Sequence, residues 1–190
     1  MHKHYKIYKP YGYLSQFINN QNKRRNKKLL SDLFDLDVNV MAIGRLDEKS
    51  EGLLLLTTDG KFSEYIRSPK IEKEYHVMVE GCVTKQHIEV LKTGVEISVN
   101  GKKYITKPCK AEILEDTSHI YERFVRDEKH GRTSWLKLII TEGKFRQVRK
   151  MTAKIGLPTL RLVRVRIGDY KLEALQPGGI TEISSLLYQK

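Results

Sequence analysis

The most informative stretch of the sequence is Met41 to Gly60, MAIGRLDEKSEGLLLLTTDG. An apolar run over 41–43 and a second over 53–56 flank a charged loop, and an Asp-Gly pair closes the second run. Short apolar runs bounded by glycine and an Asp-Gly turn predict buried strands, although four leucines also suit part of a core helix. In both cases the loop between the runs is predicted to be held rigidly at its two ends.

Asp47 is the candidate functional residue of that loop. Because Arg45 and Lys49 lie close by in the sequence, its carboxylate is expected to stay ionised at neutral pH. A fixed, ionised carboxylate can act as a nucleophile, a base or a metal ligand. The alternative is a solvated turn residue that pairs with a nearby cation. Glu48 and Glu51 could join Asp47 around Mg²⁺ in a nuclease, but the neighbouring cations oppose a metal ion, so no metal site is predicted.

The chain is strongly basic, with 35 Lys and Arg against 23 Asp and Glu and a formal net charge of +12 over 190 residues. This excess favours a polyanionic partner, and nucleic acid is favoured over a membrane surface because no basic helix carries a broad apolar face. The sequence has neither a membrane-spanning apolar run nor a secretory signal. Its two cysteines lie far apart and suit a reducing compartment, so a cytoplasmic location is expected.

Beyond this stretch, the apolar patterns predict strands alternating with short helices. Two polar segments, 19–28 and 115–133, are predicted to be loops, and the second is long enough to form a flap. After residue 169 the pattern predicts a short pair of strands or helices. Strands are predicted at the start of 5–17 and over 71–80, 95–99, 103–105, 107–114, 135–141 and 159–168, and helices over 29–36, 62–67, 84–93 and 142–156.

The helix predicted over 142–156 is amphipathic, and Arg149 lies at the edge of its apolar side. A guanidinium in that position can reach into a cleft while its neighbours face solvent or phosphate. The apolar side consists of Phe145, Val148, Met151 and Ile155, and the opposite side of Arg146, Lys150 and Lys154. The following strand carries Arg161, Arg164 and Arg166, which either contact phosphate or serve as exposed solubilising residues.

Taken together, the motifs resemble those of the bacterial rRNA pseudouridine synthases of the RsuA family. Residues 133–137 and 151–170 also resemble one subgroup of that family, and the resemblance spans roughly 5–184 in the expected order. Lys150 departs from it, because an arginine is usual there. The motifs that carry the resemblance are Lys9-Pro10-Tyr11-Gly12, Gly44-Arg45-Leu46-Asp47 followed by GLLLLT at 52–57, Lys73-Glu74-Tyr75 and EGKFRQVR at 142–149.

This resemblance implies an α+β fold with a long, mixed, mainly antiparallel sheet flanked by helices. One catalytic domain over 1–190 is expected, and a central cleft is expected to divide it into subdomains of approximately 1–70 and 71–190. Many relatives carry an N-terminal S4 RNA-binding module. None is expected here, because the KPYG motif begins within a few residues of Met1.

The resemblance also assigns roles to individual residues. Asp47 matches the essential aspartate of the family, Tyr75 the tyrosine that stacks on the target base, and Arg149 the cation that pairs with the aspartate. Arg45 matches an arginine that fills the gap left by the flipped base. Further contacts with RNA are predicted for Lys9, Lys144, Arg146, Lys150, Arg161, Arg164, Lys23, Arg24 and Arg25.

The implied activity is the isomerisation of one uridine to pseudouridine in 23S rRNA, either free or in an assembling large subunit. A monomer that needs no metal and no cofactor is expected. The reaction breaks the N1–C1′ bond and joins C5 to C1′, so the nucleotide has to be flipped out. Asp47 could add to the sugar or the base, or remove the C2′ proton. The alternatives are a non-catalytic rRNA-binding or assembly protein of the same fold, and the nuclease.

Overall fold

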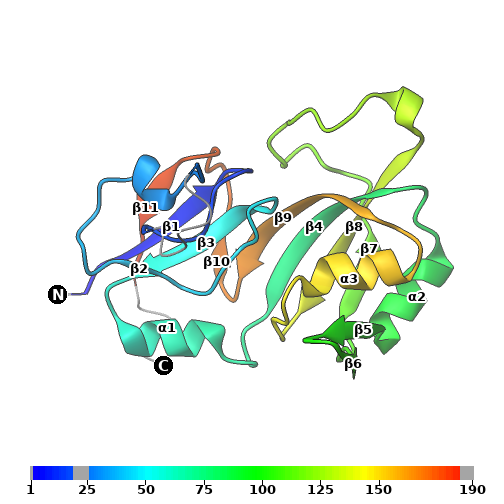
Figure 1. Cartoon of the computed structure of the whole chain (residues 1–190), viewed down its shortest axis with the longest axis horizontal. Coiled ribbons are helices and arrows are strands. Elements are labelled where there is room, and N and C mark those ends of the chain that lie inside the picture. Colours follow the sequence, from blue (N-terminus) through cyan, green and yellow to red (C-terminus); the bar gives the residue numbers. More distant parts are fainter. Residues whose placement is uncertain (1, 19–25, 185–190) are drawn as a thin grey trace. The chain divides into compact units, whose positions relative to one another are not determined.

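The structure is a computed structural model that describes residues 2–18 and 26–184 (Figure 1). Lys23, Arg24 and Arg25, predicted to touch RNA, lie outside the described residues. The chain divides into two compact units. Unit 1 comprises the described parts of 1–71 and 164–190, and unit 2 comprises 72–163.

Unit 1 is built on a sheet with the strand order β11-β1-β3-β9. Its central strand, β3 (Glu51–Thr57), is buried along its whole length, which confirms the strand predicted from the leucine run. Two short strands extend this sheet, β2 beside β3 and β10 beside β9. The other strands are β1 (His4–Lys9), β2 (Met41–Ala42), β9 (Thr159–Ile167), β10 (Tyr170–Lys171) and β11 (Ile180–Glu182).

The C-terminal segment belongs to unit 1, which corrects the predicted subdomain over 71–190. Strand β11 pairs antiparallel with β1, so that Ile180 lies opposite Ile7. The pairing supplies hydrogen-bond partners to the edge of β1 that faces away from β3. An apolar pattern marks a segment as a strand but does not show which strand it will join, and the predicted boundary at 71 therefore placed these residues with the wrong unit.

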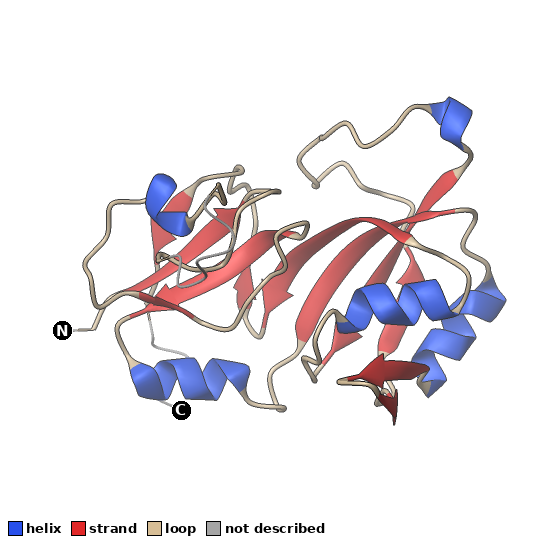
Figure 2. Cartoon of the chain, viewed as in Figure 1, coloured by secondary structure: helices blue, strands red, loops and turns tan. Residues whose placement is uncertain are grey.

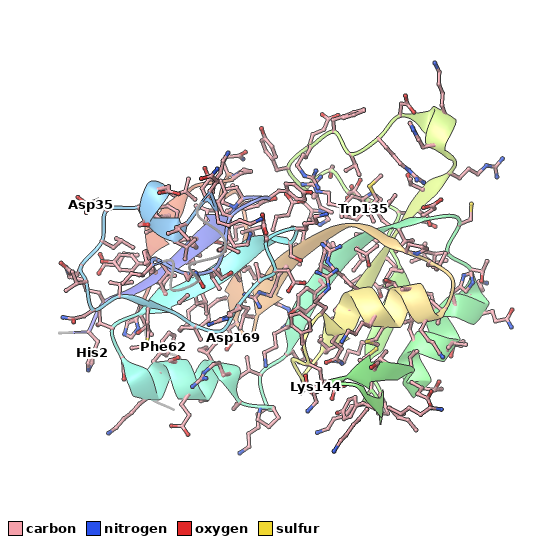
Figure 3. The ribbon with its side chains drawn as sticks, in the orientation of Figure 1. His2, Asp35, Phe62, Trp135, Lys144 and Asp169 are labelled. Carbon is pink, nitrogen blue, oxygen red and sulfur yellow. The ribbon has the colours of Figure 1, made fainter. Side chains whose placement is uncertain are left out.

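Helix α1 (Gly60–Arg67) follows β3 directly and closes one face of unit 1. Asp59 caps it, because the carboxylate accepts a hydrogen bond from the backbone N–H of Lys61 at 2.9 Å. Phe62 is fully buried (Figure 3), and its ring meets that of His4 edge to face at 4.5 Å between centroids.

The helix predicted over 29–36 is a single 3₁₀ turn, η1 (Leu30–Asp32). The carboxylate of Asp32 accepts a hydrogen bond from Leu29 N at 2.7 Å, which caps the start of the turn. Leu30 and Phe34 of this segment are nevertheless buried, and Leu33 and Leu36 are partly buried. They contribute to a core cluster of Ile7, Leu30, Phe34, Val40, Leu54 and Leu56.

Unit 2 contains a sheet with the strand order β9-β4-β8-β7 and two α-helices (Figure 2). Strands β4 (Lys73–Glu80) and β8 (Thr133–Ile140) pair antiparallel along their full length, with Tyr75 opposite Leu138. Alternation along β4 buries Tyr75, Val77 and Val79 on one face. The other elements are α2 (Lys85–Thr93), β7 (Lys110–Ile113), α3 (Gln147–Lys154) and a separate hairpin of β5 (Glu96–Val99) and β6 (Lys102–Ile105).

The tight turn of that hairpin forms at the predicted residues. Asn100 and Gly101 both have positive φ, 51° and 76°. Two consecutive residues with positive φ match the turn that best suits the twist of an antiparallel pair. The Asn-Gly prediction is therefore confirmed.

The segment 114–132 forms the predicted long loop, apart from the 3₁₀ turn η2 (Glu128–His130). It packs on the face of β4 opposite Tyr75, where His119 Nε2 lies 2.9 Å from Nδ1 of the buried His76. Arg161 donates a hydrogen bond to the carbonyl of Tyr121 at 2.6 Å and lies over the ring of Trp135 (Figure 3). Two independent contacts thus fix this loop to the sheet.

Acidification is expected to destabilise the protein through His76. Burial lowers the pKa of His76 below 6.5, His119 and Lys137 lower it further, and Glu74 opposes them. Below pH 6.5, and down to the folded-state pKa, the unfolded chain binds more protons, so the free energy of unfolding falls as the pH falls. Urea denaturation at about pH 7.5 and pH 5 should therefore show a smaller acid-induced loss for His76→Gln than for wild type.

The acid-induced loss of stability is compared between His76→Gln and wild type, because burial also lowers the pKa of His4 in unit 1. His4 is the same in both proteins and contributes equally to each. An identical acid-induced loss would show that His76 does not titrate in this range.

None of the helices in residues 2–18 and 26–184 is both long and apolar enough to span a bilayer.

Candidate active site

The residue before Asp47 is clamped by Ser15. The buried Ser15 hydroxyl accepts a hydrogen bond from Leu46 N at 2.9 Å and donates one to Leu46 O at 2.8 Å. One side chain therefore satisfies both backbone groups of Leu46, so neither is left unpaired in the interior. Nothing in the sequence singles out Ser15, because a serine after a Pro-Tyr-Gly turn is a common loop residue.

The residue after Asp47 is held as firmly. Glu48 O accepts a hydrogen bond from Gly12 N at 2.8 Å, and Lys27 Nζ lies 2.6 and 2.9 Å from the two carboxylate oxygens of Glu48. Beyond it, Ser50 N donates to Asp47 O at 2.9 Å. The half-buried Asp47 thus lies in a backbone whose position is fixed on both sides.

Lys9 is the central support of this loop. Its side chain is fully buried, and Nζ donates to the carbonyls of Pro10 at 2.8 Å, Tyr13 at 2.7 Å and Glu48 at 3.5 Å. Burial lowers the pKa of Lys9 to about 7, against the opposing effect of the three loop carboxylates. The prediction that Lys9 contacts RNA is corrected, because this ammonium faces buried carbonyls and ties the KPYG turn to the loop of Asp47.

Replacing Ser15 with alanine should lower the turnover number about tenfold, because small misplacements of a reacting group are costly. The affinity for RNA should stay within twofold, since Ser15 is buried and makes no surface. Turnover number and KM for RNA are measured separately. Ser15→Thr keeps the hydroxyl and should recover most of the rate.

The control for that variant is Ser31→Ala, which removes an exposed hydroxyl bonded to Phe17 O at 2.8 Å. Its turnover number should match wild type. A Ser15→Ala protein with normal turnover would show that Leu46 keeps its position without the clamp.

In unit 2, a buried polar network sets the start of α3. Glu142 Oε1 accepts hydrogen bonds from Lys107 N at 2.8 Å and Gln147 Nε2 at 2.6 Å, and Glu142 Oε2 accepts one from the Tyr104 hydroxyl at 2.5 Å. Gln147 Oε1 in turn accepts from Lys144 N at 2.9 Å. These bonds hold residues 142–146 in a turn that carries the chain into α3.

The helix predicted over 142–156 is therefore shorter than expected, because α3 begins at Gln147. Arg146 precedes it in the left-handed region with φ 52°, and Phe145 is 67% exposed rather than part of the apolar side. Val148 and Met151 are buried as predicted. Arg149 lies in the first turn of α3 and is half-buried.

Some of the residues predicted to contact RNA are at least partly exposed, and others are buried. Arg45, Lys144 and Arg146 are exposed, and Lys150 is half-buried with Nζ bonded to Ser98 O at 2.6 Å. Lys144 lies over the ring of Tyr104 with Nζ 4.8 Å from its centroid (Figure 3).

Arg161 and Arg164 do not fit the predicted contact with phosphate. Their exposed fractions are 3% and 6%. Arg161 is bonded to the loop 114–132, and Arg164 Nε donates to Leu53 O at 2.8 Å within unit 1. Both guanidinium groups support the fold instead of forming a basic surface.

Asp47 lies in unit 1, and Tyr75 and Arg149 lie in unit 2. Within residues 2–18 and 26–184, no three His, Cys, Asp or Glu side chains gather as metal ligands would. Glu48, which the nuclease hypothesis needs, is already bound by Lys27.

Comparison with known proteins identifies the class. A profile described as RNA pseudouridylate synthase matches residues 3–154. The chain belongs to this family, as the sequence motifs predicted.

Two individual relatives are similar to this chain over most of its length. The chain is 45% identical to ribosomal large subunit pseudouridine synthase E of Xanthomonas axonopodis pv. citri, over 89% of this chain and 87% of the relative. It is 44% identical to the protein of the same name from Vibrio vulnificus, over 93% of this chain and 73% of that protein. These relatives are the subgroup that the sequence resembles.

A crystal structure of a pseudouridylate synthase superposes with a TM-score of 0.78 at 29% identity, covering all of this chain and 74% of that one. It confirms the predicted α+β class with an open, mixed sheet and flanking helices. The predicted enzyme class, a pseudouridine synthase, is likewise confirmed.

Proposed function

We propose that this protein isomerises one specific uridine of 23S rRNA to pseudouridine, in the free RNA or in an assembling large ribosomal subunit. The observation that carries the proposal is the clamped loop of Asp47, held by Ser15 before it and by Gly12 and Lys27 after it. A protein that only binds RNA has no need of a carboxylate positioned in this way. The names of the similar proteins supply the class of substrate.

The proposed site residues have separate roles. Asp47 supplies the carboxylate that drives cleavage of the N1–C1′ bond. Tyr75 offers a flat face on which the flipped uracil stacks, and Arg149 pairs with Asp47 and keeps it oriented. Arg45, exposed beside Asp47 in the sequence, takes the place that the flipped base leaves in the RNA.

The reaction needs no external reagent. As the C5–C1′ bond replaces the N1–C1′ bond, the C5 proton is lost and N1 ends protonated, so substrate and product have the same composition. No electron carrier takes part. We propose that one catalytic domain acts as a monomer in the cytoplasm, and that it works without a metal ion or a cofactor.

The test is to incubate the purified protein with unmodified 23S rRNA in a chelator and to map pseudouridine by carbodiimide-blocked primer extension. A single new stop is expected. If free RNA gives none, the same assay on immature large subunits decides between a particle substrate and a protein without activity. Loss of activity in the chelator would favour a metal-dependent reaction.

A further inference from the structure

Unit 2 has a cavity of about 480 Å³ on the face covered by the loop 114–132. It lies where β4 ends and β8 begins, since Glu80 pairs with Thr133 at this end of the sheet. Its lining consists of Met78, Cys82, Arg126, Asp127, Gly131, Arg132 and Thr133.

Arg126 is the unusual residue of this cavity. Its Nη1 lies 3.4 Å from Glu80 Oε2, and the side chain is 16% exposed. Nε and Nη2 are buried and find no hydrogen-bond partner among the residues that the structure describes. Buried donors are nearly always paired, so two orphan donors on one guanidinium call for an acceptor.

The two orphan donors define the shape of that acceptor. Nε and Nη2 form one edge of the guanidinium and present two parallel N–H bonds, which fit two oxygens of a phosphate group. Arg132 adds a second positive charge to the lining, and Thr133 adds a hydroxyl. Asp127 would repel an anion, but its Oδ1 is bound by His130 Nδ1 at 2.5 Å.

We propose that this cavity binds a backbone phosphate of the RNA substrate. The inference rests on the proposed function and adds a contact outside the reacting nucleotide. Glu80 follows Tyr75 by five positions in β4, a distance of about 17 Å along a strand. The phosphate therefore belongs to a nucleotide that flanks the target uridine and not to the uridine itself.

The surface around the cavity favours RNA over a free phosphate ion. Phe124 and Tyr121, on the same loop, are 78% and 49% exposed. Arg123 lies between them in the sequence. Exposed aromatic rings beside cations are the surface on which unpaired bases stack, whereas a free ion makes no use of them.

The experiment measures binding of 23S rRNA to wild type and to Arg126→Gln over a range of salt concentrations. Arg126→Gln should weaken binding about tenfold at low salt, as expected for loss of a charge-assisted bidentate contact. The slope of log affinity against log salt should also fall by about 0.7 to 0.9, the value for one phosphate contact. An unchanged affinity and slope would refute the site.

Two control variants separate binding from structure. Glu80→Gln removes the same ion pair but keeps the guanidinium, so its affinity for RNA should equal or exceed that of wild type. Lys129→Gln removes one charge from the same loop but outside the cavity lining, and its effect should be less than threefold. If either control weakens binding as much as Arg126→Gln, the cavity is not a phosphate site.

Inorganic phosphate tests whether the cavity binds a free phosphate ion instead of RNA. If millimolar phosphate raises the melting temperature of wild type but not of Arg126→Gln, while both bind RNA equally, the site takes the free ion and the RNA assignment fails. The proposed activity is judged separately. A wild type that makes no pseudouridine, with RNA binding that still depends on Arg126, refutes the activity and retains the site.

Discussion

Replacing Asp47 with asparagine should abolish pseudouridine formation, lowering the turnover number on the order of 10⁴-fold, as loss of a reacting carboxylate does in other enzymes. The amide has the same size and keeps the clamped backbone on both sides, so the affinity for RNA should change by less than about threefold. Carbodiimide primer extension over a time course measures turnover, and filter binding measures affinity.

Asp37→Asn is the matched control. This aspartate is exposed and pairs with Lys3 at 2.7 Å, so its amide variant should modify RNA at the wild-type rate. Turnover in Asp47→Asn near the wild-type rate would overturn the assignment of the reacting carboxylate. Loss of turnover in Asp37→Asn as well would point to general damage to unit 1.

Replacing Lys9 with methionine should lower the free energy of unfolding by about 3 kcal/mol, because its loss leaves buried carbonyls without donors. The apolar stem of Lys9 is replaced at similar size, so packing is largely kept. Turnover should fall together with stability, since one of these carbonyls belongs to Glu48, the neighbour of Asp47. Urea denaturation measures the first effect, and single-turnover modification of RNA measures the second.

Lys27→Met is the control, because Lys27 also binds Glu48 but at the surface and through the carboxylate. The Lys27→Met substitution should lower the free energy of unfolding by no more than about 1 kcal/mol. Equal destabilisation by the two substitutions would mean that burial of Lys9 contributes nothing, and the assigned support for the loop would be wrong.

The features predicted correctly from the sequence depend on signals close together in the chain. The turn at Asn100-Gly101 needs only two residues that tolerate positive φ, and both have it. The composition of the leucine run itself indicates the strand found there. The family was predicted from motifs in the expected order and is confirmed by comparison, whereas the roles of Asp47, Tyr75 and Arg149 stay predictions.

Features that depend on distant partners were missed. The start of α3 is set by Lys107 and Tyr104, about forty residues before the helix, through their hydrogen bonds to Glu142. Burial of Lys9 and Arg161 was not predicted either, because a cation in an alternating strand gives the same pattern whether it faces water or a backbone carbonyl. The role of Ser15 was not predicted, because it depends on hydrogen bonds between its hydroxyl and the backbone of Leu46, which no sequence pattern indicates.

Strand β9 begins in unit 2 and ends in unit 1. This division affects the order in which the two units can fold during synthesis. During translation, residues 72–163 leave the ribosome as one continuous segment, so every strand and helix of unit 2 is available before the rest of β9 has been synthesised (Figure 1). The sheet that carries Asp47 waits for Ile180 to reach Ile7. A nascent chain therefore holds Asp47, the proposed reacting residue, beside an unfinished sheet until residue 180 has been made.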